Sequence, residues 1–176
     1  MTRFLLLPVA LLLLITGCTT INQSSRGAAT LDSSWGVVPF INNTETPYAG
    51  DRAEAIAVSL LYGRGVRHLE SYRSKPQEDG QLLPDRGVRQ QEQGVAWAKE
   101  KGVRYVLLGT VTEWRYKVGL DGEPVVGMTL QLVDLKDDRV LWSGSAGKSG
   151  WSRDAVSAVA QQVLAALINS IDLAGR

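Results

Sequence analysis

Hydrophobic and polar positions alternate most clearly in the middle of the chain. In segments 104–118 and 126–132, every second residue is large or β-branched, which is the pattern of strands with one buried face. These positions are Val106, Leu108, Thr110, Thr112, Trp114, Tyr116, Val126, Met128, Leu130 and Leu132. Asp121 and Gly122 lie between the segments and form a pair that tight hairpin turns favour. A second turn at 136–138 leads to a last strand at 139–145, so three strands joined by hairpins are predicted.

Apolar residues in the last part of the chain recur with the spacing of an α-helix. Segment 153–173 carries one unbroken apolar stripe, which predicts a long amphipathic helix. The stripe consists of Val156, Val159, Ala160, Val163, Leu164, Leu167, Ile168 and Ile171.

The first half of the chain alternates between strand and helix. Segment 35–40 is a short apolar run that predicts a strand, and Thr46 and Pro47 then offer a helix cap and a first helical residue. The helical face that follows consists of Ala53, Ile56, Ala57, Leu60 and Leu61, and Gly63 and Gly65 end it. A second strand is predicted at 66–72. An exposed loop at 74–86 precedes a weakly amphipathic helix at 87–101, whose apolar positions are Val88, Val95 and Ala98.

The order β-α-β-α-β-β-β-α follows from these elements. Early strands that are separated by helices pair in parallel through crossovers, whereas late strands that are joined by tight turns pair antiparallel. The sequence therefore predicts one α/β (α+β) domain with a mixed sheet and helices packed against it.

The N-terminus has the pattern of a bacterial lipoprotein leader. Arg3 precedes an apolar run from Phe4 to Ile15, which is shorter than the roughly 20 residues that span a bilayer. The run ends in Ile15-Thr16-Gly17-Cys18, an aliphatic residue, two small residues and the only cysteine of the chain. A plain signal peptide is the alternative. We expect a signal peptide at 1–17, acylation of Cys18 with groups such as palmitate, a flexible tether at 18–34 and a globular domain at 35–176.

Charge and composition narrow the classes of function. The chain has 19 Lys and Arg against 18 Asp and Glu, a net charge of +1, and its basic residues are scattered. This distribution argues against a nucleic-acid partner. The single histidine, His68, lies in a predicted strand without any motif that would present a nucleophile to it. The chain has too few Cys and His residues to form a structural zinc site. We therefore expect a binding protein without catalytic residues, cofactor or metal.

Three features are candidates for binding, of which the third is the polar loop at 42–50, directly after the first strand, whose expected role is mainly capping and turning. Trp151 lies in a small polar loop with Lys148 and Arg153, where an indole can reach a membrane interface and the cations can meet lipid headgroups. Packing on the core or against another protein are the alternatives for this tryptophan. Asp121 and Glu123 at the predicted hairpin tip are the second feature, although acids also occupy turns simply because turns are solvated.

Several stretches resemble one family: residues 35–55, residues 109–122, Val140-Leu141-Trp142-Ser143-Gly144 and Gly150-Trp151-Ser152-Arg153. They are similar to the PelC family, the lipoproteins of Pel exopolysaccharide export in biofilm formation. The resemblance implies a fold like the TolB amino-terminal domain and a non-enzymatic subunit. It further implies a dodecameric ring on the periplasmic face of the outer membrane, beneath a PelB-like β-barrel and tetratricopeptide protein that exports a cationic polysaccharide. Trp151 would then contact the membrane and Asp121 would face the polymer.

The residue after Cys18 is Thr19 rather than aspartate, which in lipoprotein sorting predicts the outer membrane. A periplasmic regulator lipoprotein that activates a cell-wall synthase is the alternative function. Such a regulator normally needs a longer tether, because an extended chain spans only ~3 Å per residue. An envelope hydrolase is disfavoured by the lone histidine.

Overall fold

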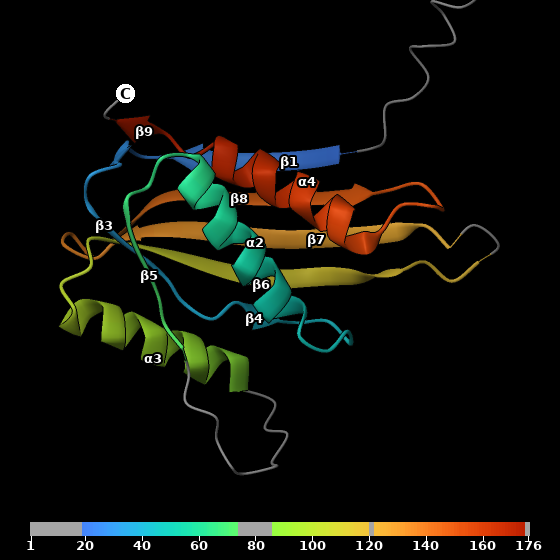
Figure 1. Ribbon diagram of the computed structural model, residues 1–176, viewed down its shortest axis with the longest axis horizontal. Coiled ribbons are helices and arrows are strands. Elements are labelled where there is room, and N and C mark those ends of the chain that lie inside the picture. The colour runs from blue at the N-terminus through green and yellow to red at the C-terminus, as the bar shows by residue number, and fades with distance from the viewer. Residues whose placement is uncertain (1–18, 74–85, 120–121, 175–176) are drawn as a thin grey trace, which may run out of the picture.

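A central mixed sheet organises the computed structural model, which describes residues 19–73, 86–119 and 122–174. Cys18 and Asp121 therefore lie outside the described residues. The strands of this sheet follow the order β1-β8-β7-β6-β3-β5, and β4 also pairs with β6 (Figure 1). Their bounds are β1 Thr19–Ser25, β3 Ser34–Val37, β4 Ile41–Asn42, β5 His68–Ser71, β6 Tyr105–Tyr116, β7 Pro124–Asp134 and β8 Arg139–Ser149. Strands β2 (Ala29–Thr30) and β9 (Leu173–Ala174) form a small parallel pair beside it.

The predicted fold class is confirmed. Strand β3 pairs in parallel with both β5 and β6, whereas β6, β7 and β8 form an antiparallel meander. The helices between and after them are α2 (Ala49–Gly63), α3 (Arg86–Glu100) and α4 (Val156–Asn169). The order from β3 to α4 matches the order that the hydrophobic pattern predicts, apart from the two-residue strand β4.

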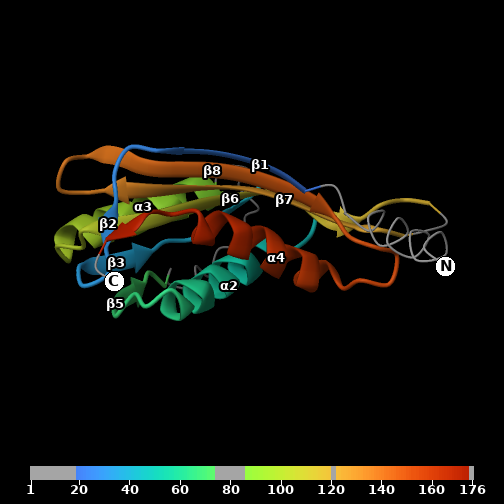
Figure 2. The same ribbon diagram turned by 90° about the horizontal axis from the view of Figure 1, so that it is seen from above.

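Helices cover both faces of the sheet. Helices α2 and α4 pack on one face, as the view from above shows (Figure 2). Alternation along the strands separates two clusters: Val37 and Leu107 belong to the main core, whereas their neighbours Val38 and Val106 pack with Ala98 of α3 on the opposite face. The alternation predicted for β6 does not keep to one face: Val106 and Leu108 pack on the side of α3, whereas Trp114 lies in the main core, because the register shifts between Val111 and Glu113.

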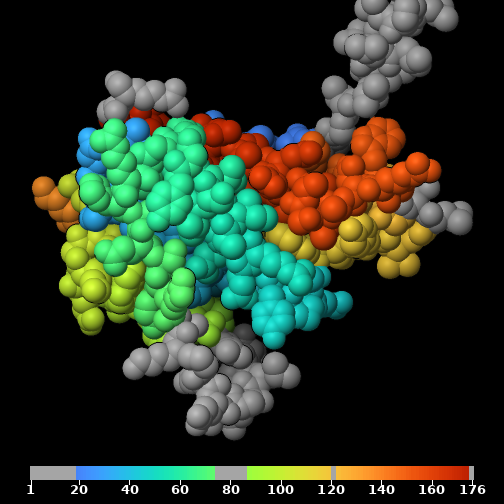
Figure 3. Space-filling view, viewed as in Figure 1, coloured from blue at the N-terminus to red at the C-terminus, as the bar shows by residue number. Residues whose placement is uncertain are grey.

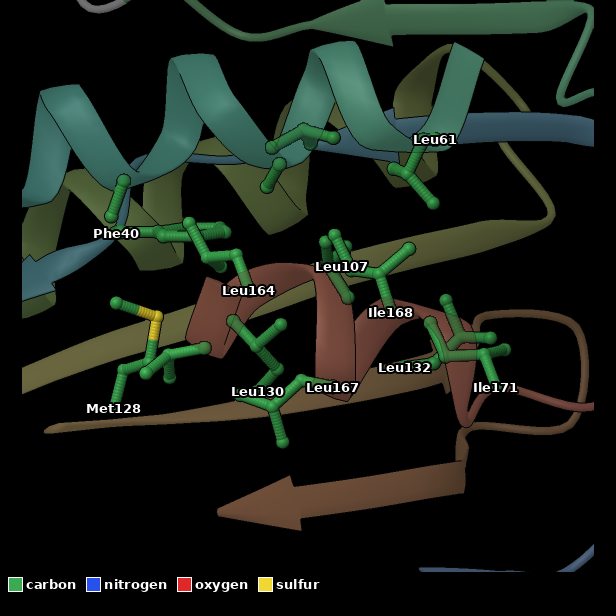
Figure 4. Close-up of a cluster of buried hydrophobic side chains, with 14 of the residues drawn as sticks. Phe40, Leu61, Leu107, Met128, Leu130, Leu132, Leu164, Leu167, Ile168 and Ile171 are labelled. Atoms are coloured by element: carbon green, nitrogen blue, oxygen red, sulfur yellow. The ribbon is translucent and has the colours of Figure 1, made fainter. Parts of the chain in front are cut away.

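The main core lies between the sheet and the pair α2 and α4. Figure 4 shows side chains from β7 and β6 meeting those from α4 and α2, together with Phe40. The predicted stripe of α4 is buried from Val159 to Ile168, and Ile171 just beyond the helix is buried too. Three tryptophans, Trp35, Trp114 and Trp142, are also fully buried in the domain.

Two predicted details of the helices are wrong. Helix α2 begins at Ala49 rather than at Pro47, because Tyr48 adopts a left-handed conformation with φ of 61°. Thr46 donates its hydroxyl hydrogen bond to the Trp114 carbonyl, so it does not cap the helix. In α3, Val88 is 44% exposed instead of buried, since this helix contacts the sheet mainly through its later turns.

The flexible tether expected at 18–34 is not what the structure shows for its described residues. Residues Thr19–Ser25 form β1, which pairs antiparallel with β8 over its whole length, and Ala29 and Thr30 form β2. All side chains of β1 are exposed, so the sequence has no hydrophobic pattern that predicts the strand. The exposed edge of β8 supplies backbone partners, and backbone pairing does not depend on side-chain type. Strand β8 itself extends to Ser149 rather than to the predicted 145.

Candidate membrane-facing site

Trp151 lies in a short loop between β8 and α4 that is tied down by hydrogen bonds. The Gly150 N–H donates to the Pro124 carbonyl at 2.8 Å, which joins the loop to β7. The Trp151 N–H donates to Asp154 Oδ2 at 2.8 Å, and the Asp154 N–H donates back to the Trp151 carbonyl at 2.9 Å. The backbone is thus fixed, while the Trp151 side chain is 62% exposed. Among the alternatives left open by the sequence, burial in the domain core is excluded.

Two cations lie within three residues of Trp151 in the sequence. Lys148 is half-buried at the end of β8, and Arg153 is exposed in the loop. Neither side chain forms an ion pair with any residue in the part of the chain that the structure describes. Their charges therefore remain available to an anionic group.

The pairing of β1 with β8 places the first described residue, Thr19, near the loop that carries Trp151. Thr19 lies opposite Lys148 in the β1–β8 register, three residues before Trp151. Thr19 is bonded directly to Cys18, so covalent geometry keeps the two Cα atoms about 3.8 Å apart. Thr19, which follows the residue predicted to be acylated, thus lies at the end of β8 that precedes Trp151.

The β6–β7 hairpin reaches the same end of the molecule, at the right of Figure 1. The Lys117 N–H donates to the Glu123 carbonyl at 2.8 Å, and the Lys117 ammonium pairs with the Glu123 carboxylate at 2.9 Å. Glu123 is thus a neutralised acid rather than a free one. Asp121 lies outside the described residues, so the structure does not place it. We name the surface formed by residues 116–118, 122–124 and 148–155 the Trp151 end.

Sequence reasoning missed two apolar residues of the Trp151 end. Val118 is fully exposed at 101%, and Tyr116 is 49% exposed, with its hydroxyl oxygen accepting a hydrogen bond from the Val156 N–H at 3.2 Å. The alternating pattern placed Tyr116 on a strand but carries no signal for its exposure. Val118 is the last residue of the alternating segment 104–118, next to the turn, and an apolar residue so close to a turn is the only signal in the sequence for its exposure.

A cleft of about 700 Å³ opens beside this end, between residues 43–47 and residues 112–116. In Figure 3 the first of these segments, in cyan, projects beside the yellow hairpin. Glu113 is paired with Arg115 at 2.7 Å, whereas exposed Glu45 has no ion pair with any described residue. The cleft thus places Glu45, which belongs to the polar loop 42–50 and has no ion pair among the described residues, next to the hairpin.

The structure gives little support to a role for His68 or to a metal site. His68 is exposed on β5, away from the Trp151 end. Within residues 19–73, 86–119 and 122–174, no group of three or more His, Cys, Asp or Glu side chains is arranged to hold a metal ion. No helix among these residues is both long and apolar enough to cross a membrane.

Comparisons with known proteins bear on this arrangement. A solved PelC dodecamer from Paraburkholderia phytofirmans is 34% identical to this chain, covers 90% of it with 100% of its own length, and superposes with a TM-score of 0.75. A single-substitution variant of that dodecamer is 35% identical over 87% of this chain and 98% of its own, with a TM-score of 0.71. Lipoprotein GNA1162 from Neisseria meningitidis, at 21% identity, 79% and 97% coverage and a TM-score of 0.55, shows the fold alone.

Other comparisons give no match: no family model fits the chain, and no curated protein sequence matches it. The similarity to the solved PelC structure nevertheless covers 90% of this chain. The chain belongs to the PelC family and is a Pel export-related lipoprotein.

Proposed function

We propose that this protein is a lipid-anchored, non-enzymatic ring subunit on the periplasmic face of the outer membrane. The ring guides a cationic Pel polysaccharide toward a PelB-like outer-membrane barrel. The observation that carries the proposal is the 34% identity to PelC dodecamers over 90% of the chain. A dodecamer in that relative supports a ring of this chain, because homologous subunits of similar fold tend to assemble through the same surfaces.

Membrane contact is assigned to the Trp151 end. The exposed indole of Trp151 suits the interface between headgroups and acyl chains, and the unpaired cations Lys148 and Arg153 suit anionic headgroups. Fully exposed Val118 adds apolar surface at the same end. Acyl chains on Cys18 would supply the lasting anchor, at about 0.8 kcal/mol for each buried methylene.

The path of the polymer is assigned to the hairpin tip. Asp121 is the acid that we propose to face the polymer, because Glu123 is already neutralised by Lys117 at 2.9 Å. Repeating one carboxylate around a closed ring concentrates negative potential, which attracts a cationic chain over a distance that salt shortens. Glu45, which has no ion pair among the described residues, adds a second acid near the hairpin.

The alternative function, a regulator that activates a cell-wall synthase, has less support. Such a protein has to reach across the periplasm from its lipid. Here Thr19, the residue after Cys18, is already paired in the sheet, so the described chain leaves no free segment between the lipid and the domain.

The polymer-guiding role is tested by Asp121→Asn in cells that lack the native chain. We expect less polysaccharide outside the cells and an unchanged mass of the detergent-solubilised ring, because the substitution removes one negative charge per subunit and keeps a side chain of the same size. Asp137→Asn is the matched control, since Asp137 lies at the β7–β8 turn, at the opposite end of the sheet. Undiminished export with Asp121→Asn would remove the electrostatic role, and a monomeric native chain would remove the ring.

Membrane contact is tested by Trp151→Ala against Trp151→Phe. The lipid-free chain from Thr19 is mixed with vesicles that contain anionic lipid, and the bound fraction is measured by flotation. We expect several-fold weaker binding for the alanine variant and nearly native binding for phenylalanine, which keeps an aromatic ring. Equal binding of all three chains would assign Trp151 to a protein interface instead.

A further inference from the structure

Strand β1 is held without any burial of its side chains. Its seven residues pair one by one with β8, from Thr19 opposite Lys148 to Ser25 opposite Trp142. Every β1 side chain is exposed, and even the one apolar side chain, Ile21, is 45% exposed. Packing therefore contributes little to its position, and backbone hydrogen bonds to β8 keep it in place.

The direction of β1 decides where the lipid lies. The first backbone contact after β1 is the Arg26 N–H, which donates to the Leu141 carbonyl at 2.8 Å, near the start of β8. Trp151 follows the other end of β8. The chain thus enters the body of the domain at the end far from Trp151, and only the run of β1 along β8 returns Thr19 to the Trp151 end.

The distance involved is more than half the length of β8, since β1 pairs with seven of its eleven residues. Seven strand residues rise about 3.3 Å each, so β1 carries Thr19 roughly 20 Å back along β8. A free segment of the same length would leave the lipid attached loosely at the far end. The domain could then rotate beneath the membrane and present any of its surfaces to it.

We infer that β1 is a brace, a strand whose role is to hold the acylated end next to Trp151 so that the Trp151 end faces the lipid surface. The inference rests on the proposed function, since it requires acylated Cys18 and contact between Trp151 and the bilayer. Its partner is the lipid surface itself, met by the apolar indole and by the unpaired cations Lys148 and Arg153. The acyl chains give attachment, and the brace gives orientation.

The brace is broken by Ile21→Pro together with Asn22→Pro. Neighbouring N–H groups of an edge strand point alternately toward the paired strand and away from it, so one of the two prolines removes a bond to β8. Ile21→Ala together with Asn22→Ala is the matched control, because it shortens the same side chains and keeps both N–H groups. Six Gly and Ser residues inserted between Cys18 and Thr19 form a second variant, which frees the lipid and leaves β1 intact.

The readout is quenching of Trp151 fluorescence by brominated lipids in vesicles that carry the acylated chain. Each variant is also made with Trp151→Phe, and the difference between the two chains isolates Trp151 from the other four tryptophans. We expect strong quenching in the native chain and the alanine pair, and its loss in the proline pair and the insertion variant. Unchanged emission of the buried tryptophans serves as the check that each variant is folded.

The outcomes separate the brace from the function on which it rests. Native-like quenching in the proline pair and the insertion variant overturns the brace, while the Trp151 contact with lipid stands. Absence of quenching in the native chain overturns both. Hydrogen exchange provides an independent test: if the amides of Thr20, Gln23 and Ser24 exchange as fast in the native chain as in the proline pair, β1 is not held, and this result also overturns the brace.

Discussion

Glu54 on α2 provides a stability measurement that tests the electrostatics of the fold. Its side chain is half-buried, and its pKa is raised from the model-peptide value of 4.5 to about 7. Burial is the main cause, repulsion from Asp51 adds to it, and a hydrogen bond from the backbone of Phe40 opposes it. The folded protein therefore holds this proton more tightly than the unfolded chain does.

The sign of the pH dependence follows from linkage. A carboxyl group with a raised pKa loses its proton less readily in the folded state, so the free energy of unfolding falls as pH rises from about 4.5 to about 7. The two pKa values set an upper limit of about 3 kcal/mol on that fall. Water reaches part of the group and screens it, so we expect about 1–2 kcal/mol.

Glu54→Gln removes the charge at every pH and keeps a hydrogen-bond acceptor. We expect this variant to be about 1–2 kcal/mol more stable than the native chain at pH 8 and nearly equal to it at pH 4.5. Urea unfolding of the lipid-free chain between these pH values, followed through the buried tryptophans, measures the difference. Glu92→Gln on α3 is the matched control, because Glu92 is exposed.

Two results would contradict this reasoning. A Glu54→Gln chain with the same pH dependence as the native chain would show that Glu54 is not the group responsible. A gain in stability that is equal at pH 4.5 and pH 8 would point to packing rather than to charge. Asp51→Asn should give a smaller gain at pH 8, since repulsion from Asp51 is the lesser cause.

Two further substitutions test packing and a buried ion pair. A Cβ added at Gly109 would lie 2.5 Å from ring atoms of Phe40, so Gly109→Ala should lower the free energy of unfolding in urea by about 1–3 kcal/mol, and native stability would contradict this contact. Arg104 binds both carboxylate oxygens of Asp134 at 2.7 Å and holds the pKa of Asp134 below its usual 3.8. This stabilisation is present above that value and is lost as pH falls below it, so Asp134→Asn should show a flatter acid-unfolding curve, and equal slopes would refute the assignment.

The sequence alone predicts those parts of the fold that bury side chains. Strands β6 and β7 and helix α4 each present one apolar face to the main core, and burial imposes a period of two or of about 3.6 residues on such elements. The exposed Trp151 could also be proposed from sequence, because a large aromatic residue stands among small polar ones. Its exposure, however, follows from the bonds that its backbone makes with Asp154, which no spacing reveals.

Tertiary structure decided what depends on backbone pairing and on neighbours distant in sequence. Strand β1 has no buried side chain, so only the exposed edge of β8 makes Thr19–Ser25 a strand instead of a tether. Glu123 loses its free charge to Lys117 across the hairpin, and α2 starts late because Tyr48 is left-handed and Thr46 bonds to Trp114 instead of capping the helix. Side-chain burial leaves a period in the sequence, whereas backbone hydrogen bonds and ion pairs leave none, because many sequences satisfy them equally well.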